Sequence, residues 1–217
     1  MTHRAVRQLG LVHVVAAEDT RRTRRLLDHY GLSAPVVSLF EHNERQRVPG
    51  LVRRLCAGDS VALVTDAGSP GVADPGYRLV RAAIDAGVRV ESVPGPSAVI
   101  AALQVSGLPT DAFAFAGFLP VKAGARRRRL EELAERRETI VAFEAPHRIA
   151  STLEDLEAVW GDRPVALARE LTKVFEEVLR GTARSIRERL TPDRRRGEMV
   201  LVLSGRGLKA DRSRARS

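Results

Sequence analysis

Asp66 and the loop that follows it carry the residue types best suited to holding a small polar ligand. The carboxylate comes directly after the β-prone run of residues 61–65, and Gly68 and Gly71 follow it. A carboxylate only accepts hydrogen bonds, so it suits hydroxyl or amine groups, and glycines let a ligand approach the backbone closely. The loop has neither G-x-x-x-x-G-K-[ST] nor G-x-G-x-x-G, which argues against a phosphate cradle. Two interpretations stay open from this segment alone, a ligand site and a strand-to-helix turn that binds nothing.

Two other segments place polar groups where an apolar run gives way to a helical pattern. Ser97, at the end of Pro94-Gly-Pro-Ser97, is placed to cap a helix whose first amides offer donors to a ligand. Asp19 or Thr20 is placed to cap the helix after residues 12–17. Cap and turn chemistry alone also explains both segments. All three loops lie at the carboxyl ends of expected strands, where open α/β sheets bind their ligands.

These loops must be positioned by an α/β fold, because short apolar runs alternate with amphipathic helical patterns along the chain. Such alternation predicts a mostly parallel sheet covered on both faces. The expected strands are residues 12–17, 35–40, 61–65, 88–93, 113–118, 139–143, 164–169, 174–180 and 198–203. The expected helices are residues 20–30, 44–57, 74–86, 97–106, 125–137, 147–160 and 185–190.

The best domain boundary is the segment 117–124, which contains two glycines and a proline. We therefore expect an N-terminal α/β domain over residues 1–118 and a C-terminal α/β domain over residues 119–205. Residues 206–217 carry five basic side chains, one acidic side chain and no apolar periodicity. That composition predicts a disordered basic tail that adds phosphate contacts.

Composition excludes several classes of protein. No apolar run approaches the roughly 20 residues of a membrane helix, and the amino terminus lacks a signal-peptide pattern. The single cysteine, Cys56, excludes an intrachain disulfide framework, and the five histidines lack metal-ligand spacing. We therefore expect a cytoplasmic protein without a membrane segment or a metal. We also expect Cys56 to face the core from a helix.

The charge balance favours a polyanionic partner. The 217 residues carry 36 basic and 27 acidic side chains, a net charge of +9, and only three of the basic residues are lysines. Such a balance is typical of proteins that bind nucleic acid. The alternative is a protein whose arginine-rich surface has no polyanionic partner.

Taken in order, the segments resemble one family. They are Ala17-Glu-Asp-Thr-Arg21, His42-Asn-Glu44, Thr65-Asp-Ala-Gly-Ser-Pro70, Asp74-Pro-Gly76, Pro94-Gly-Pro-Ser97, Gly117-Phe-Leu-Pro120, Pro146-His-Arg148, Ala168-Arg-Glu-Leu-Thr-Lys173 and Gly197-Glu-Met199. Their order and spacing resemble the bacterial small-subunit ribosomal RNA (cytidine-2′-O)-methyltransferases of the tetrapyrrole-methylase superfamily. Each motif alone is weak, but the ordered set covers nearly the whole chain and is highly specific.

The resemblance implies two α/β domains with S-adenosylmethionine held in the cleft between them, a homodimer, and 16S ribosomal RNA or the small ribosomal subunit as substrate. It also implies the cofactor-binding residues. These are Asp66, Ala67, Gly68, Ser69, Pro70, Ser97 and Ala98 in the first domain, and backbone at Phe143, Glu144, Glu198 and Met199 in the second. Members of the family begin with an additional strand and a Pro-Ile-Gly-Asn-Leu-Gly-Asp loop. This sequence starts at Met1-Thr-His-Arg, so we expect that first strand to be missing.

Methyl transfer to a ribose hydroxyl needs close positioning and benefits from a general base or a positioned charge. The candidates on loops expected to face the cleft are Glu18, Asp19, Glu44, Glu170 and Lys173. Arg21, Arg148 and Arg169 are expected to contact phosphates, because a guanidinium fork matches phosphate geometry. The alternative for these arginines is structural pairing with nearby carboxylates.

Two further functions remain alternatives to the ribosomal RNA enzyme. One is a methyltransferase of the same fold that acts on a tetrapyrrole. The segments 146–148 and 169–173 favour the RNA enzyme over it. The other is a non-catalytic RNA-binding remnant, which the missing first strand favours.

Overall fold

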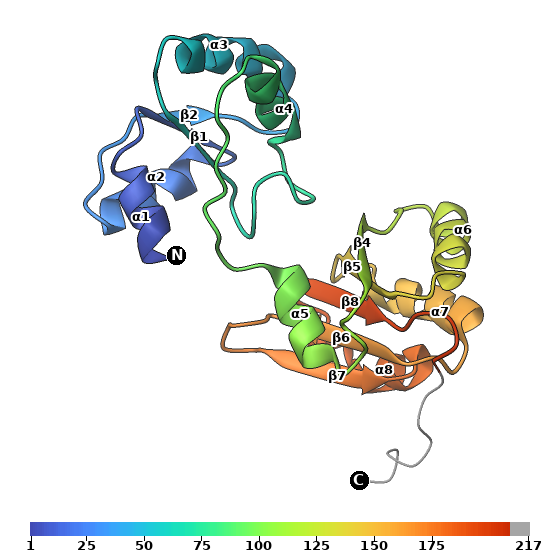
Figure 1. The fold of residues 1–217 in the computed structure, drawn as a ribbon. Helices are drawn as coiled ribbons and strands as arrows, with labels where there is room; N and C mark the ends of the chain where they lie inside the picture. The colour runs from blue at the N-terminus through green and yellow to red at the C-terminus, as the bar shows by residue number, and fades with distance from the viewer. Residues whose placement is uncertain (209–217) are drawn as a thin grey trace. The chain divides into compact units, whose positions relative to one another are not determined.

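The computed structural model describes residues 1–208 and divides into two compact units, one before and one after the junction of Ser97 and Ala98. The expected α/β fold is confirmed, with one sheet in each unit (Figure 1). Most of the expected basic tail, residues 209–217, lies outside the described residues.

The first unit holds a three-stranded parallel sheet in the order β2-β1-β3. Its elements in chain order are α1 (His3–Leu9), β1 (Val14–Ala17), α2 (Thr20–His29), β2 (Val36–Ser38), α3 (Glu44–Cys56), β3 (Val61–Val64) and α4 (Tyr77–Asp85). Helices α1 and α2 cover one face through Leu9 and Leu27, whereas α3 and α4 cover the other through Leu51 and Leu79 (Figure 1). The central strand β1 is buried along its whole length, as expected of a parallel strand covered on both faces.

The second unit holds a five-stranded mixed sheet in the order β4-β5-β8-β6-β7. Its elements are α5 (Ala98–Ser106), β4 (Phe113–Phe118), α6 (Ala123–Ala134), β5 (Thr139–Glu144), α7 (Ile149–Trp160), β6 (Val165–Arg169), β7 (Glu177–Gly181), α8 (Ala183–Arg189), the 3-10 helix η1 (Pro192–Arg194) and β8 (Met199–Leu203). Helix α5 packs Ala102 and Leu103 on one face, and α6, α7 and α8 cover the other face with side chains such as Leu153 and Ile186.

The second sheet corrects the expectation of a mostly parallel arrangement. Among its neighbouring strands, only β4 and β5 form a parallel pair, while β8 lies antiparallel to both β5 and β6. Strand β7 also pairs antiparallel with β6, because a short loop rather than a helix joins them. Strand–helix alternation predicts parallel pairs only where a helix crosses over between neighbouring strands.

The division between the units also differs from the expected boundary after residue 118. Strand β4 hydrogen-bonds to β5, so residues 113–118 belong to the second sheet. Residues 88–93, expected to form a strand, are not in one, and Val90 and Val93 are exposed. A β-prone segment becomes a strand only when a neighbouring strand supplies its hydrogen bonds, and within residues 1–208 this segment has no such partner.

No helix within residues 1–208 is both long enough and apolar enough to cross a lipid bilayer. Cys56, expected to face the core, is exposed at the end of α3.

Candidate functional site

The carboxyl ends of β1 and β3 bring Glu18 and Asp66 together in the first unit. Ala17 pairs with Val64 in the sheet, so the next residues of both strands emerge side by side. The Asp66 amide donates to the Glu18 carboxylate at 3.1 Å. Arg22, in the first turn of α2, donates to Asp66 at 2.9 Å. Two strands and one helix therefore fix the position of the Asp66 carboxylate.

The loop after Asp66 is built on glycines that adopt left-handed backbone conformations. Gly68 and Gly71 have φ of 73° and 79°, which glycine adopts without strain. A Cβ at either position would meet no atom within 4 Å, so both glycines face open space. Gly76 is different: at φ 132°, its Cβ would come within 2.5 Å of Leu63 Cδ2. Gly76 thus lets the end of the loop pack tightly on β3.

Asp74 adds a third carboxylate to this region, and sequence reasoning did not select it. Partial burial, and then the negative charge of Glu18, raise the pKa of Asp74, while a hydrogen bond from Thr65 acts against the shift. The charge of Asp66 raises it further. The sequence signals were a further acidic residue in the loop that connects β3 to α4 and its place in the Asp74-Pro-Gly76 motif.

Asp19 and Glu44, two of the base candidates, are engaged in holding the fold. Asp19 accepts hydrogen bonds from the amides of Arg21 and Arg22 at 2.8 and 3.3 Å, which confirms it as the cap of α2. These bonds lower the pKa of Asp19. Glu44 is buried and accepts a 2.6 Å hydrogen bond from the Gly76 amide, so it ties α3 to the start of α4.

Ser97 and Ala98 lie at the junction of the two units. Helix α5 begins at Ala98, so the expected helix start after Pro94-Gly-Pro96 is confirmed. Ser97 is half-buried, and Ala98 is exposed.

In the second unit, the expected cofactor residues meet where β5 ends and β8 begins. Glu144 pairs directly with Met199 in the sheet, and Phe143 packs its ring against Phe115 and Phe118. The Glu144 carboxylate is fully buried and has three partners: Arg148 at 2.6 Å, the Ala145 amide at 2.7 Å and the Thr152 hydroxyl at 2.6 Å. With both oxygens occupied, only the backbone of Glu144 remains to bind a ligand.

Glu170, Lys173 and Glu198 form one ion-pair network between the loop after β6 and the segment before β8. The Lys173 ammonium lies 2.9 Å from Glu170 and 3.1 Å from Glu198. Glu170 also accepts from the Glu198 amide at 2.8 Å. A Cβ on Gly197 would fall 2.2 Å from the Glu170 carboxyl, so the close approach requires glycine there.

This network makes Glu170 a weak base and Lys173 a stable cation. The Glu198 amide, and then Lys173, lower the pKa of Glu170. The bond to Glu170 raises the pKa of Lys173. A general base needs a pKa near the working pH, and these shifts move both groups away from it.

The three arginines expected to contact phosphate lie in different environments. The Arg21 side chain is 87% exposed, whereas those of Arg148 and Arg169 are 12% and 11% exposed. Arg148 pairs with Glu144, and Arg169 donates to Glu177 at 2.9 Å. These contacts favour structural pairing for Arg148 and Arg169, while Arg21 keeps a surface open to a ligand.

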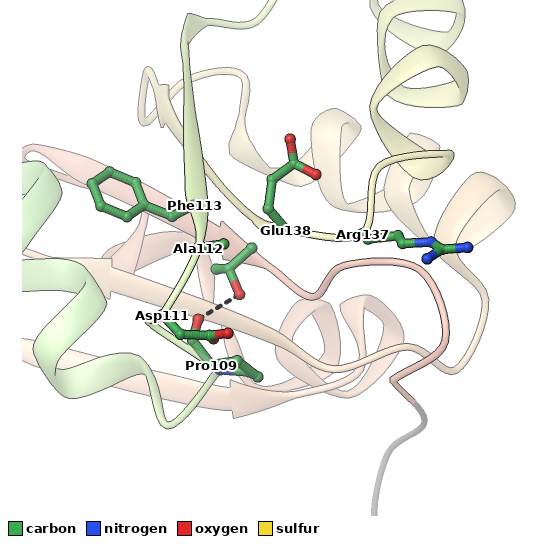
Figure 2. Close-up of a pocket in the computed structure, with 7 residues that line it drawn as sticks. Pro109, Asp111, Ala112, Phe113, Arg137 and Glu138 are labelled. Atoms are coloured by element: carbon green, nitrogen blue, oxygen red, sulfur yellow. Dashed lines mark hydrogen bonds between the residues drawn. The ribbon is translucent and has the colours of Figure 1, made fainter.

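A shallow pocket of about 580 Å³ lies at the opposite end of the second sheet (Figure 2). It is lined by Pro109, Asp111, Ala112, Phe113, Arg137, Glu138 and Thr139. Phe113 and Thr139 begin β4 and β5, so the pocket opens at the amino ends of parallel strands. Ligands of open α/β sheets bind at the carboxyl ends, so this pocket is not the candidate site. Within residues 1–208, no group of three His, Cys, Asp or Glu side chains is arranged to hold a metal.

The sequence pattern of one protein family, the tetrapyrrole (corrin/porphyrin) methylases, matches residues 1–187 of this chain. The chain belongs to this family. The family expected from the ordered motifs is therefore confirmed.

Curated relatives named for ribosomal RNA methylation share much of the sequence. A protein of Xylella fastidiosa strain Temecula1 named ribosomal RNA small subunit methyltransferase I is 49% identical over 208 residues. The match spans 94% of this chain and 76% of the relative. The protein of the same name from Haemophilus influenzae is 45% identical, over 95% of this chain and 74% of the relative.

Solved structures share the fold at much lower identity. A cobalt precorrin-4 methyltransferase aligns with a TM-score of 0.64 and 19% identity, over 94% of this chain and 88% of the other. The uroporphyrin-III C-methyltransferase of Thermus thermophilus, solved with S-adenosylhomocysteine, gives 0.62 and 20%, over 94% and 90%. These likenesses concern the fold alone.

Proposed function

We propose that the chain is an S-adenosylmethionine-dependent methyltransferase that methylates the 2′-hydroxyl of a cytidine in 16S ribosomal RNA. The observation that carries this proposal is the 49% identity to a ribosomal RNA small subunit methyltransferase over 94% of the chain. The motif set that resembles the cytidine-2′-O enzymes supports the finer choice of base and hydroxyl.

The cofactor is supported by the Thermus thermophilus relative, which was solved with S-adenosylhomocysteine, the product left after methyl donation. From the first unit we assign residues 66–70 together with Ser97 and Ala98 to cofactor binding. Two observations fit this assignment: the Asp66 carboxylate is held in place by Arg22, and Gly68 faces open space. From the second unit we assign the backbone at residues 143–144 and 198–199, because the Glu144 carboxylate is fully occupied.

The bound cofactor would supply an electrophilic methyl group, and the protein's task is to align a ribose hydroxyl with it. Positioning can account for much of the acceleration of such a displacement. Among the base candidates, we favour Glu18. Asp19 caps α2, and Glu44 anchors the start of α4. Glu170 and Lys173 are paired with each other. Asp74 joins Glu18 as a candidate, because burial and neighbouring charge move its pKa toward the working pH.

A tetrapyrrole substrate is less well supported. The structures named for tetrapyrrole chemistry are 19–22% identical to this chain, whereas the relatives named for ribosomal RNA reach 42–49%. We further propose a homodimer in the cytoplasm, as the family resemblance implies. Light scattering on the purified chain would test the dimer.

Methyl transfer from labelled S-adenosylmethionine to small ribosomal subunits tests the reaction. We expect label in the 16S RNA, and we expect alkaline hydrolysis to spare the bond next to the labelled nucleotide, because a 2′-O-methyl group removes the attacking hydroxyl. Asp66→Asn should reduce transfer at limiting S-adenosylmethionine, and Arg54→Gln, which breaks an exposed ion pair away from the loop, is the control that should retain it. A tetrapyrrole is offered as the methyl acceptor in a parallel assay. Label on the tetrapyrrole, or no label on either the RNA or the tetrapyrrole, would refute the proposal. The second result would favour the non-catalytic RNA-binding alternative if the chain still bound RNA.

A further inference from the structure

Two helices of the first unit present a concentration of exposed arginines on one surface. Helices α1 and α2 lie on the same face of the first sheet, where Leu9 and Leu27 belong to one buried cluster (Figure 1). Their outward sides carry the α1/α2 arginine surface, which we define as Arg4, Arg7, Arg21, Arg24 and Arg25. All five are exposed.

Helical spacing explains why these side chains gather. Arg4 and Arg7 are three residues apart, and Arg21 is three and four residues from Arg24 and Arg25. Side chains at these separations lie on the same side of a helix, about one turn apart. Like charges at this spacing destabilise a helix slightly, so the fold itself gains nothing from the arrangement.

The charge of this surface is left largely unneutralised. Within the described residues, the only ion pair of the five within 4 Å is the long contact of Arg21 with Asp19, at 3.8 Å. Some arginines elsewhere in the same unit have close partners, such as Arg54 with Asp59 at 2.7 Å and Arg81 with Asp85 at 2.9 Å. Others on α3, such as Arg47 and Arg53, are exposed without an ion pair to any residue of 1–208, but they are not gathered beside the candidate site.

The surface also adjoins the candidate site. Helix α2 starts directly after Glu18 and its cap Asp19. Arg22 in its first turn binds Asp66, so Arg21 lies one residue from a direct contact with the ligand loop. A polyanion lying along α2 would therefore end at the loops to which we assign the reaction.

We propose that the α1/α2 arginine surface binds the phosphate backbone of the RNA substrate and guides it to the loops around Glu18 and Asp66. This inference rests on the proposed function, since it names a substrate-binding surface for the same site. Guanidinium groups suit this role, because their forked donors match phosphate oxygens. Such contacts position the RNA and carry no sequence information of their own.

The test compares two double variants of the full chain that remove the same charge. Arg24→Gln with Arg25→Gln lies on the proposed surface. Arg47→Gln with Arg53→Gln lies on α3, which covers the opposite face of the sheet, and both residues are exposed and outside the ion pairs found in residues 1–208. Glutamine and arginine have similar helix propensities, so neither exchange should disturb its helix.

The measurement is the affinity for 16S ribosomal RNA transcribed in vitro, over a series of salt concentrations. Log affinity falls with log salt, and removing one phosphate-binding side chain makes this negative slope shallower by roughly 0.7 to 0.9. We expect the α2 variant to bind about tenfold more weakly at roughly 0.1 M salt, with a slope flatter by about 1.5. The α3 variant should keep the slope of the unaltered chain.

An unchanged slope in the α2 variant, or equal decreases in affinity in both variants, would overturn the inference. Failure of the proposed function gives a different result. In that case the unaltered chain would transfer no methyl group, while the selective loss of RNA binding in the α2 variant would still support the surface. If methyl transfer occurs and the α2 variant binds RNA normally, the function stands and the surface is refuted.

Discussion

The two units place similar residues at the carboxyl ends of their strands and neutralise them very differently. In the first unit, three carboxylates lie near one another, and the ion pair found for Asp66 is with Arg22. In the second unit, Glu144 is fully buried with three partners, and Glu170 shares Lys173 with Glu198. The first set keeps chemistry available for a ligand, and the second set is already satisfied by the protein.

Residue type and position at a strand end therefore do not define a site. Arg148 and Arg21 both follow an apolar strand in a motif shared with the family, yet one is buried in an ion pair and the other is exposed. A buried charge requires a partner, because leaving it unpaired costs several kcal/mol. An exposed arginine has no such requirement and remains free to meet a substrate.

The largest expected effect on stability comes from removing the buried Glu144 carboxylate of the second unit. Glu144→Ala should lower the free energy of unfolding by about 3–5 kcal/mol, because it leaves the Arg148 guanidinium buried without its carboxylate. It also removes the partner of the Thr152 hydroxyl. Denaturant unfolding measures the change.

A second variant separates charge from packing at the same place. Glu144→Gln combined with Arg148→Met removes both charges and keeps most of the volume, so it should recover much of the lost stability. A Glu144→Ala protein as stable as the unaltered chain would show that the two units do not differ in the way described.

Asp66 is one of the three neighbouring carboxylates of the first unit, which we call the open set. Its substitution should change stability less than that of Glu144 and should weaken cofactor binding. Its ion pair with Arg22 is partly exposed, so Asp66→Asn should change the free energy of unfolding by less than about 1 kcal/mol. The same exchange removes a charge-assisted acceptor, which is worth about 1.5–3 kcal/mol, so cofactor affinity should fall about 10- to 100-fold. Titration calorimetry with S-adenosylmethionine, beside an unfolding curve, measures both.

The outcome at Asp66 separates two roles. Loss of stability with unchanged cofactor affinity would assign Asp66 to the turn alone. Arg54→Gln provides the control, because it breaks a comparable exposed ion pair with Asp59 on the same unit, away from the loop.

Much of this organisation was readable from the sequence, because it depends on local patterns. The apolar runs at β1 and β3, the cap at Asp19 and the helix start at Ala98 follow from residue type and spacing. The ordered motifs also identified the family. These features need no knowledge of what packs against them.

The remaining features depend on long-range contacts that periodicity does not encode. Strand β8 inserts between β5 and β6, which makes the second sheet mixed, and no local signal specifies that neighbour. The pairing of Arg169 with Glu177 forms across β6 and β7 and depends on their register. The raised pKa of Asp74 likewise needs burial and the nearby charge of Glu18, both of which arise only in the folded unit.

The smallest expected effect is on how folding stability changes with pH, and it has opposite signs in the two units. Asp74 has a raised pKa in the folded protein, so its contribution to stability is fully present below its unfolded pKa of about 3.9 and is lost as pH rises through the folded value. Glu170 has a lowered pKa, so its contribution is present above its unfolded pKa of about 4.3 and is lost as pH falls through the folded value.

Neutral substitutions should therefore give opposite pH slopes. Relative to the unaltered chain, Asp74→Asn should gain stability as pH rises from about 3 to about 7, by less than about 1 kcal/mol, because the group is partly exposed. Over the same range, Glu170→Gln should lose stability relative to the unaltered chain. Denaturant unfolding at each pH measures both differences. Slopes of the same sign would mean that the carboxylates of the first unit are as well satisfied as those of the second, and the distinction between an open and a satisfied set would fail.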